Sequence, residues 1–317
     1  MHILWCRARC IVCVSLLLVL LPACLLPPLP RVVKIGLVAP FEGRYRYVGY
    51  DAIYAARLAV REINAAGGAG GWMLELAAYD DRADPEMART VARNLVTDPD
   101  VVAVIGHYRE ASTGTAVVVY GEAGMPLLAV GAWLTPTDVL VWRMTPSPEQ
   151  VAVAMAQTTP LEMRYSDGSA PSVLGGIFPF ASSLVEGTFL FAPTRLKEMD
   201  VWRTGTLFVT PYPLPRDLPG LDAWRAAYRA VGPHVPDPGV YALPTYEAVY
   251  ALAEAIAAAT LAEGQPSRSG IQAALPNVHR AGALGTVAWD ATGYWRDMPL
   301  YVYVWEQAGA RLVESRR

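Results

Sequence analysis

The chain has 317 residues, of which 53% are hydrophobic and 17% charged, and its net charge is −3. A chain of this length and composition buries a sizeable core, which excludes an intrinsically disordered protein or a polyelectrolyte. No basic tract accompanies the small negative charge, so we expect no nucleic-acid partner.

The N-terminus has the pattern of an export signal. Two arginines precede an apolar run over residues 11–21; the run has the length of a signal-peptide core and is too short to span a bilayer comfortably. It ends in Leu-Pro-Ala-Cys at Cys24, which looks like a lipoprotein cleavage box. We expect a signal peptide over residues 1–23 and, over residues 24–31, a lipidated Cys24 with its tether. The alternative is an uncleaved membrane anchor; either way, the rest of the chain lies outside the cytoplasm.

The sequence lacks the usual marks of an enzyme. All four cysteines lie at or before position 24, so the body of the protein has no disulfide, thiolate metal site or cysteine nucleophile. Neither lysine follows a glycine as in a P-loop, the four histidines are isolated, and no Gly-x-Ser-x-Gly elbow occurs. We expect no enzymatic activity, no cofactor and no metal site.

From residue 32 onward, short apolar runs alternate with segments that carry apolar residues at helical spacing. The runs are typical of central parallel strands and the segments of amphipathic helices. Asp84 and Pro85 supply an N-cap and a proline at the first helical position, which explains the acidic residues at 80–84 better than a calcium site does. The alternation predicts a doubly wound parallel sheet, with strands at 32–39, 73–79, 101–105 and 126–130 and helices at 50–64, 85–97 and 112–123.

Beyond residue 132 the pattern is less regular. Residues 141–144 are expected to cross between lobes, and Ser147 with Gln150 has the spacing of a capping box that starts a helix. We assign residues 32–140 to an N-terminal α/β lobe and residues 141–317 to the crossover, a second lobe and C-terminal segments that return to the first. The further elements expected are strands at 173–177, 207–210, 286–289 and 300–305 and helices at 221–231, 245–261 and 267–275.

A ligand site is predicted beyond the carboxyl ends of the strands, where open α/β sheets bind ligands. This rule selects the loops at residues 41–47, 107–113 and 132–135. The helix that begins near residue 112 points free backbone N–H groups and its positive dipole end at one of these loops, which suits an anionic ligand group. The candidate ligand-binding residues are Tyr45, Tyr47, His107, Arg109, Glu110, Ser112, Thr113, Ala132, Trp133 and Thr135, with Tyr212 from the second lobe.

Several of these residues have a structural alternative. Arg109 and Glu110 either bind a zwitterion as a charge pair or form a solvated loop pair. The rings of Tyr45 and Trp133 either stack on a planar or sugar-like ligand or pack between lobes. His107 either contacts the ligand or is a structural histidine with its hydrogen bonds satisfied.

The segment 33–81 begins with Val-Lys-Ile-Gly-Leu-Val-Ala-Pro and continues with Ala-Val-Arg-Glu-Ile-Asn-Ala-Ala-Gly-Gly from Ala59. It closely resembles the N-terminal lobe of Leu/Ile/Val-binding proteins, the substrate-binding components of branched-chain amino-acid ABC transporters. The resemblance implies a type I periplasmic binding protein fold and a monomer that captures a small polar solute, such as an amino acid or amide, by hinge closure. It also implies an ABC permease in the membrane as partner. Shorter similar blocks follow at residues 104–107, 120–126, 143–147, 205–210, 246–249 and 285–290.

The sequence departs from this family in two places. The family has a longer segment where this chain has residues 157–205, so the second lobe looks reduced. Relatives that bind amino acids place small hydroxyl residues in the ligand loops; Ser112, Thr113 and Thr135 keep hydroxyls, but Trp133 replaces a small polar residue. The ligand therefore need not be a simple branched-chain amino acid. A sensing or accessory lipoprotein without transport, and a structural surface lipoprotein without ligand, remain alternatives.

Overall fold

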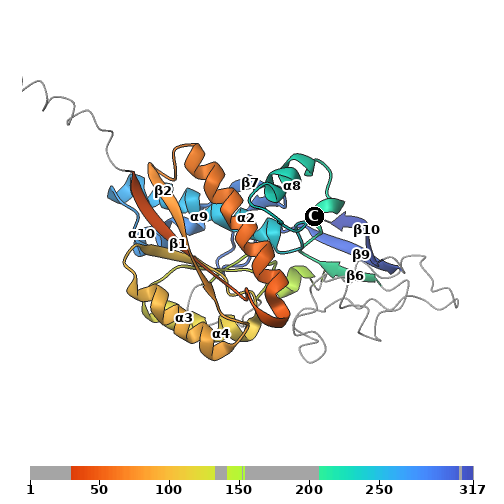
Figure 1. The fold of residues 1–317 in the computed structure, drawn as a ribbon, viewed down its shortest axis with the longest axis horizontal. Helices are drawn as coiled ribbons and strands as arrows, with labels where there is room; N and C mark the ends of the chain where they lie inside the picture. Colours follow the sequence, from red (N-terminus) through yellow and green to blue (C-terminus); the bar gives the residue numbers. More distant parts are fainter. Residues whose placement is uncertain (1–29, 133–140, 152, 154–206, 307–308, 317) are drawn as a thin grey trace, which may run out of the picture. The chain divides into compact units, whose positions relative to one another are not determined.

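The computed structural model describes residues 30–132, 141–151, 153, 207–306 and 309–316. Its main feature is a five-stranded sheet with the strand order β2-β1-β3-β4-β5 (Figure 1). β1 pairs with β3, β3 with β4, and β4 with β5, each in parallel. The strands are β1 (Arg31–Ala39), β2 (Trp72–Asp80), β3 (Val101–Ile105), β4 (Leu127–Ala129) and β5 (Trp142–Arg143).

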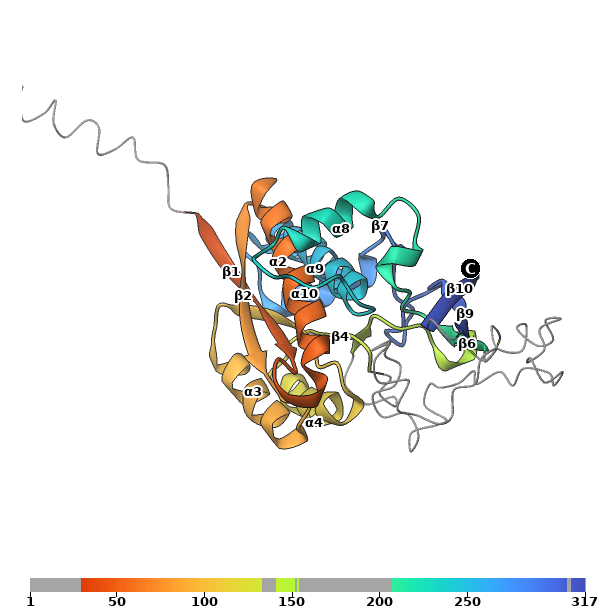
Figure 2. The ribbon, with the colours of Figure 1, turned by 45° about the vertical axis from the view of Figure 1, so that its right-hand side comes forward.

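Helices cover both faces of this sheet (Figures 1 and 2). Helix α2 packs against α9, which also contacts α10, and α3 packs against α4. Each pair sends apolar side chains toward the sheet, so the buried faces follow from the helical spacing of the sequence. The bounds are α2 (Arg46–Ala65), α3 (Pro85–Thr97), α4 (Glu110–Glu122), α9 (Ala242–Glu263) and α10 (Arg268–Ala274).

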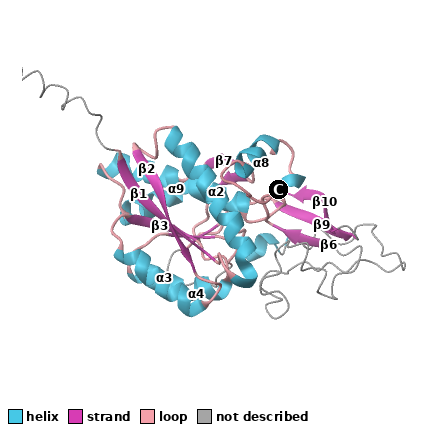
Figure 3. Ribbon diagram, viewed as in Figure 1, coloured by secondary structure: helices cyan, strands magenta, loops and turns pink. Residues whose placement is uncertain are grey.

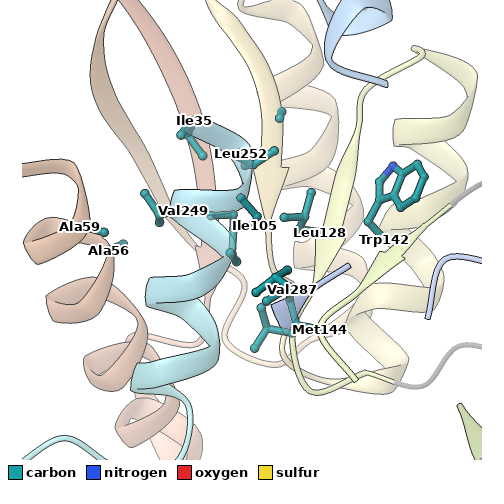
Figure 4. Close-up of a cluster of buried hydrophobic side chains, with 14 of the residues drawn as sticks. Ile35, Ala56, Ala59, Ile105, Leu128, Trp142, Met144, Val249, Leu252 and Val287 are labelled. Atoms are coloured by element: carbon teal, nitrogen blue, oxygen red, sulfur yellow. The ribbon is translucent and has the colours of Figure 1, made fainter. Parts of the chain in front are cut away.

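The two faces have separate hydrophobic cores. Ile35 and Leu37 of β1 lie in the core beneath α2 and α9, together with Val249 (Figure 4). Val38 points to the other face and joins Val117 beneath α3 and α4. This division follows from the alternation of side chains along a strand, and it explains why central strands are apolar on both sides.

The described part of the chain after residue 206 adds a second, antiparallel sheet (Figure 3). Its order is β10-β9-β6, and β9 pairs with both neighbours in antiparallel fashion. A separate hairpin pairs β7 with β8. The bounds are β6 (Leu207–Thr210), α8 (Asp222–Arg229), β7 (Arg280–Gly282), β8 (Gly285–Val287), β9 (Leu300–Glu306) and β10 (Gly309–Arg316), with short 3-10 turns at Gly43–Tyr45, Pro215–Asp217 and Leu275–Asn277.

Three predicted helix starts need correction, the first being that of α9, which begins at Ala242 rather than at residue 245. α2 begins at Arg46 rather than at residue 50, and α4 at Glu110 rather than at residue 112. Within the predicted crossover, β5 pairs in parallel with β4, so the first sheet extends to Arg143. The capping box is confirmed, because Ser147 N donates to Gln150 Oε1 and Gln150 N donates to Ser147 Oγ.

Other predictions lie outside the described residues. They include the signal peptide at 1–23, the lipidated Cys24, the strand at 173–177 and the shortened segment at 157–205. Within the described residues, no helix combines the length and the apolar character needed to cross a bilayer.

Candidate functional site

The strand order places a topological switch point between β1 and β3. After β1 the chain enters α2 on one face of the sheet, and after β3 it enters α4 on the other face. Connections that leave neighbouring strands in opposite directions make room for a ligand at the carboxyl edge. The loops at residues 40–45 and 106–109 therefore flank the candidate site.

Tyr45 and Arg109 meet across these two loops. The guanidinium carbon of Arg109 lies 4.0 Å from the centroid of the Tyr45 ring, and Arg109 Nη2 donates to Tyr45 Oη at 3.3 Å. Both side chains are partly exposed. This cation–π contact and hydrogen bond hold the guanidinium at the edge of the site.

The N-terminus of α4 supplies the second feature of the site. Its N-cap residue, Arg109, makes no capping bond with its side chain, and the N–H groups of a first helical turn lack acceptors within the helix. Ser112 in this turn is fully buried, and its Oγ has no hydrogen-bond partner in the described part of the chain. The neighbouring Thr113 differs, because its Oγ1 donates to His107 O at 2.7 Å and to Arg109 O at 2.8 Å. A positive helix end beside an unused hydroxyl is suited to an anionic group.

Glu110 and Arg143 bring charge to the same edge of the sheet. Glu110 is the exposed first residue of α4. Burial lowers the pKa of Arg143, whereas the nearby Tyr294 and Glu110 raise it. The Arg143 guanidinium lies 4.5 Å from the Tyr294 ring and its Nη1 donates to Thr292 O at 3.1 Å, while its backbone N donates to Gly293 O at 2.7 Å. Arg143, which the sequence did not single out, thus fastens the end of the first sheet to residues 292–294.

His107 has the geometry of a structural histidine. It is fully buried, its Nδ1 lies 2.7 Å from Asp81 Oδ2, and its Nε2 lies 3.1 Å from the Tyr120 hydroxyl. Both ring nitrogens are therefore engaged by the protein. Of the two interpretations offered by the sequence, the structure favours the one in which His107 joins the ends of β2 and β3 to α4.

Tyr212 is buried rather than presented to a ligand. Its side chain is 2% exposed; its hydroxyl donates to Met144 O at 2.8 Å and accepts from Gly131 N at 2.9 Å. The phenol therefore links the loop after β4 to the residue that directly follows β5. Tyr212 has this supporting role in the structure, and its direct contact with a ligand stays a prediction.

Two tyrosines that the sequence analysis missed surround Tyr212. The Tyr241 ring lies 5.9 Å from that of Tyr212 and 5.5 Å from that of Tyr108, centroid to centroid, and the Tyr108 hydroxyl lies 2.8 Å from Thr245 Oγ1. Tyr241 is the N-cap residue of α9 and follows Tyr108 by more than a hundred positions, so no local pattern could have joined them.

The remaining candidates are scattered. Tyr47, in the first turn of α2, is half-buried, and Ala132 is fully buried. Trp133 and Thr135 lie outside the described residues.

The predicted N-cap is confirmed, because Asp84 accepts a hydrogen bond from Met87 N at 2.8 Å. The described residues contain no group of three or more histidines, cysteines or acids placed to hold a metal ion.

Comparison with known families identifies the scaffold. The family model described as periplasmic binding protein matches residues 32–159 and 183–310. This chain belongs to the periplasmic binding protein family. Its members bind solutes and are not enzymes, and membership implies a location outside the cytoplasm.

Individual periplasmic binding proteins resemble this one over part or all of their length. An amino acid binding protein of Pseudomonas aeruginosa is 37% identical, and the Leu/Ile/Val-binding protein of Escherichia coli K12 is 34% identical, each over 100 residues. Each match covers 32% of this chain and only 27% of the relative.

Solved structures agree on the fold across most of the chain. The branched-chain amino acid transporter substrate binding protein LivJ from Streptococcus pneumoniae, in complex with isoleucine, has a TM-score of 0.67 at 19% identity and covers 90% of this chain and 99% of its own. A solute binding protein from R. palustris in complex with 4-hydroxybenzoate has a TM-score of 0.67 at 16% identity, with coverage of 90% and 97%. These likenesses confirm the predicted type I periplasmic binding protein fold.

Proposed function

We propose that this protein is the solute-binding lipoprotein of an ABC importer and captures a small polar ligand that carries an anionic group. The signal peptide would cover residues 1–23, and residues 24–31 would be the tether that begins with a lipidated Cys24. Residues 32–140 would form the N-terminal lobe, and residues 141–317 the crossover, the second lobe and the returning segments.

The observation that carries the ligand class is the buried hydroxyl of Ser112 in the first turn of α4, which has no hydrogen-bond partner among the described residues. A buried polar atom without a partner costs free energy, so the site gains when a ligand oxygen supplies the missing bond. The positive end of α4 favours a negative charge on that oxygen. Isoleucine and 4-hydroxybenzoate, the ligands named for two structural relatives, both carry a carboxylate, which supports the same choice here.

The Tyr45–Arg109 pair would contact the end of the ligand that lies away from the anionic group. A ring that lies under a guanidinium offers an apolar edge next to a fixed positive charge. Polar or planar groups fit such an edge better than a short aliphatic side chain does. We therefore place an amino acid with a polar or aromatic side chain, or a related aromatic acid, ahead of leucine.

Capture would proceed by closure of the second lobe over a ligand already docked on the first. Closure is favourable only if the closed form makes ligand contacts that the open form lacks. The closed protein would then deliver the solute to an ABC permease, and a lipid tether would raise its effective concentration there.

A thermal-shift screen of the protein truncated before Cys24 tests this proposal. The panel pairs each carboxylic acid with its amide, so that leucine stands beside leucinamide and 4-hydroxybenzoate beside 4-hydroxybenzamide, and adds short peptides and sugars. Ligand binding raises the melting temperature by mass action, and we expect shifts from acids and none from their amides. No shift from any compound would overturn the transport function, and shifts from amides alone would overturn the anionic ligand.

A further inference from the structure

The guanidinium of Arg109 is fixed at the edge of the candidate site without an acidic partner among the described residues. Its carbon lies 4.0 Å from the centroid of the Tyr45 ring, and its Nη2 donates to Tyr45 Oη at 3.3 Å. Within the described part of the chain Arg109 makes no ion pair. Its positive charge is therefore held in place but not paired.

The contact with Tyr45 leaves most of the donors of Arg109 available. A guanidinium carries five N–H groups in one plane, and a ring that lies against its face does not use them. Tyr45 Oη accepts from Nη2 alone. The other N–H groups can bond a carboxylate through two parallel hydrogen bonds. Because the ring already holds the guanidinium, little conformational freedom is lost when such a ligand binds.

The two loops that flank the site contain more arginines than acids. The first loop, residues 41–47, carries Arg44 and Arg46, and the second, residues 107–113, carries Arg109. The acids of these loops are Glu42 and Glu110, and both are exposed. A chain with a net charge of −3 thus places a surplus of positive charge at this edge of the sheet. Such a surplus attracts anionic solutes.

One anionic group on the solute would not satisfy both parts of the site. Ser112 offers its buried hydroxyl within the first turn of α4, whereas the side chain of Arg109 reaches the loop after β1, where it meets Tyr45. Closure of the second lobe, as proposed, would remove water from the guanidinium, and a charge without water is costly unless it is paired. A second carboxylate on the solute supplies that pairing.

We propose that Arg109 binds a second carboxylate of the solute, so that the ligand is a dicarboxylate such as an acidic amino acid or an aromatic diacid. The inference rests on the proposed function and narrows its ligand class. Ser112 and the N-terminus of α4 bind the first carboxylate, and Tyr45 positions the guanidinium for the second.

Calorimetric titration of the full chain, purified in a mild detergent, tests the inference. The probes are glutamate, glutarate and terephthalate, each compared with its mono-amide, namely glutamine, glutaramate and 4-carbamoylbenzoate. Each pair keeps one carboxylate and nearly the same shape, so the second negative charge is the main difference. We expect a diacid to bind at least about tenfold more tightly than its mono-amide, the ratio that one charge-assisted hydrogen bond provides.

Substitutions of Arg109 assign this preference to the guanidinium. Arg109→Gln removes the charge and should reduce the affinity for the diacid to that for its mono-amide, while unchanged binding of the mono-amide shows that the variant is folded. Arg109→Lys keeps the charge and should keep a smaller preference, because an ammonium group lacks the parallel pair of donors. The matched control is Arg57→Gln, which removes the same charge from an exposed position on α2 outside both loops.

The inference is overturned if the mono-amides bind as tightly as the diacids. It is also overturned if Arg109→Gln weakens a diacid and its mono-amide by the same factor, which would place Arg109 at the first carboxylate. Both outcomes leave the proposed capture of an anionic solute intact. If none of the six compounds binds, the inference fails as well, and the thermal-shift screen decides separately whether the proposed function survives.

Discussion

Two adjacent hydroxyls in the first turn of α4 have opposite roles. Thr113 is fully bonded to the backbone of His107 and Arg109, whereas Ser112 is equally buried and has no partner in the described part of the chain. A hydroxyl that makes no bond in the free protein is available to a ligand, and one that makes two is part of the frame. Substitutions can separate the two roles.

We predict that Ser112→Ala weakens binding of the acid identified by the thermal-shift screen by about tenfold, the equivalent of one hydrogen bond at 1.4 kcal/mol. Its free energy of unfolding should change little or rise, because no bond is lost. Thr113→Val should instead lower the free energy of unfolding by about 1–3 kcal/mol, since the buried His107 carbonyl loses the hydroxyl that donates to it. Isothermal titration and urea unfolding measure the two effects. If Ser112→Ala binds the acid as tightly as wild type, Ser112 is not a ligand contact.

Asp51 is a second buried group with a measurable signature. It accepts hydrogen bonds from Gly239 N at 3.0 Å and Tyr241 N at 3.2 Å, which fixes the start of α9 against α2. Burial raises the pKa of its carboxyl from 3.8 to about 7, and the two backbone donors offset part of that rise. The native state therefore holds a proton that the unfolded state releases between about pH 4 and pH 7.

We predict that Asp51 makes the protein less stable as the pH rises through this window. A shift of this size corresponds to at most about 4 kcal/mol of unfolding free energy, present in full below pH 4 and lost by about pH 7. Urea unfolding should show wild type losing stability relative to Asp51→Asn, which cannot ionise, as the pH rises from 5 to 8. Glu75→Gln, which alters an exposed carboxylate on β2, is the control. A difference that stays constant with pH would contradict the raised pKa.

At the scale of elements, the apolar runs of the first lobe determine its strands. The run of residues 101–105 was predicted with the same bounds as β3, because all five residues are buried and β-branched or small. The start of α2 was placed four residues late, since Arg46 and Tyr47 show no apolar spacing and the helix continues directly from a 3-10 turn. β5, with only two residues, is too short to produce a pattern and is defined by its pairing with β4.

The candidate site likewise contains some residues that local sequence patterns select and others that they do not. Loops that follow strands could be selected from the sequence, and Tyr45, Arg109 and Ser112 were found by that rule. The contacts of Tyr212 and Arg143 could not be predicted, because their partners lie many residues away and depend on how the segments between the sheets are folded together. Local patterns therefore indicate the loops of the site but not the residues that hold them in position.

The first and third strands approach each other closely just where the site begins. Gly106 follows β3 with a φ of +132°, and a Cβ there would lie 2.2 Å from Val38 O of β1. Gly124 has a φ of +59°, but a Cβ there would meet nothing within 4 Å. Gly106 is therefore required both by its backbone conformation and by the lack of room for a Cβ, whereas Gly124 is required by its backbone conformation alone.

We predict that Gly106→Ala lowers the free energy of unfolding by about 3 kcal/mol or more, because it adds backbone strain and forces β1 and β3 apart. Gly124→Ala adds the strain alone and should cost about 1–2 kcal/mol. Thermal or urea unfolding of the two variants compares them directly. Equal losses would show that the backbone conformation, and not the contact with Val38, sets the requirement for glycine at position 106.

For the molecule as a whole, the proposed function requires three parts: a first lobe, a second lobe and an N-terminal tether. The first lobe is defined by a described sheet, two cores and the family match. The proposed second lobe would include β6, β9 and β10, which form the antiparallel sheet. Transport requires both lobes to meet over a solute near a permease, so the N-terminal tether matters as much as the site itself.

We predict that Cys24→Ala releases the protein from the membrane. If residues 1–23 are removed and Cys24 carries lipid, losing that cysteine removes the acyl chains that hold an otherwise water-exposed protein at the bilayer. Fractionation of cells should move the variant from the membrane to the soluble extracytoplasmic fraction, and labelling with radioactive palmitate should disappear. Cys13→Ala, which alters a cysteine inside the apolar run, should leave both results unchanged. Wild-type protein that keeps residues 1–23 and takes up no palmitate would instead favour the uncleaved anchor over residues 11–21, and the proposed lipoprotein would become a protein held by its own N-terminal segment.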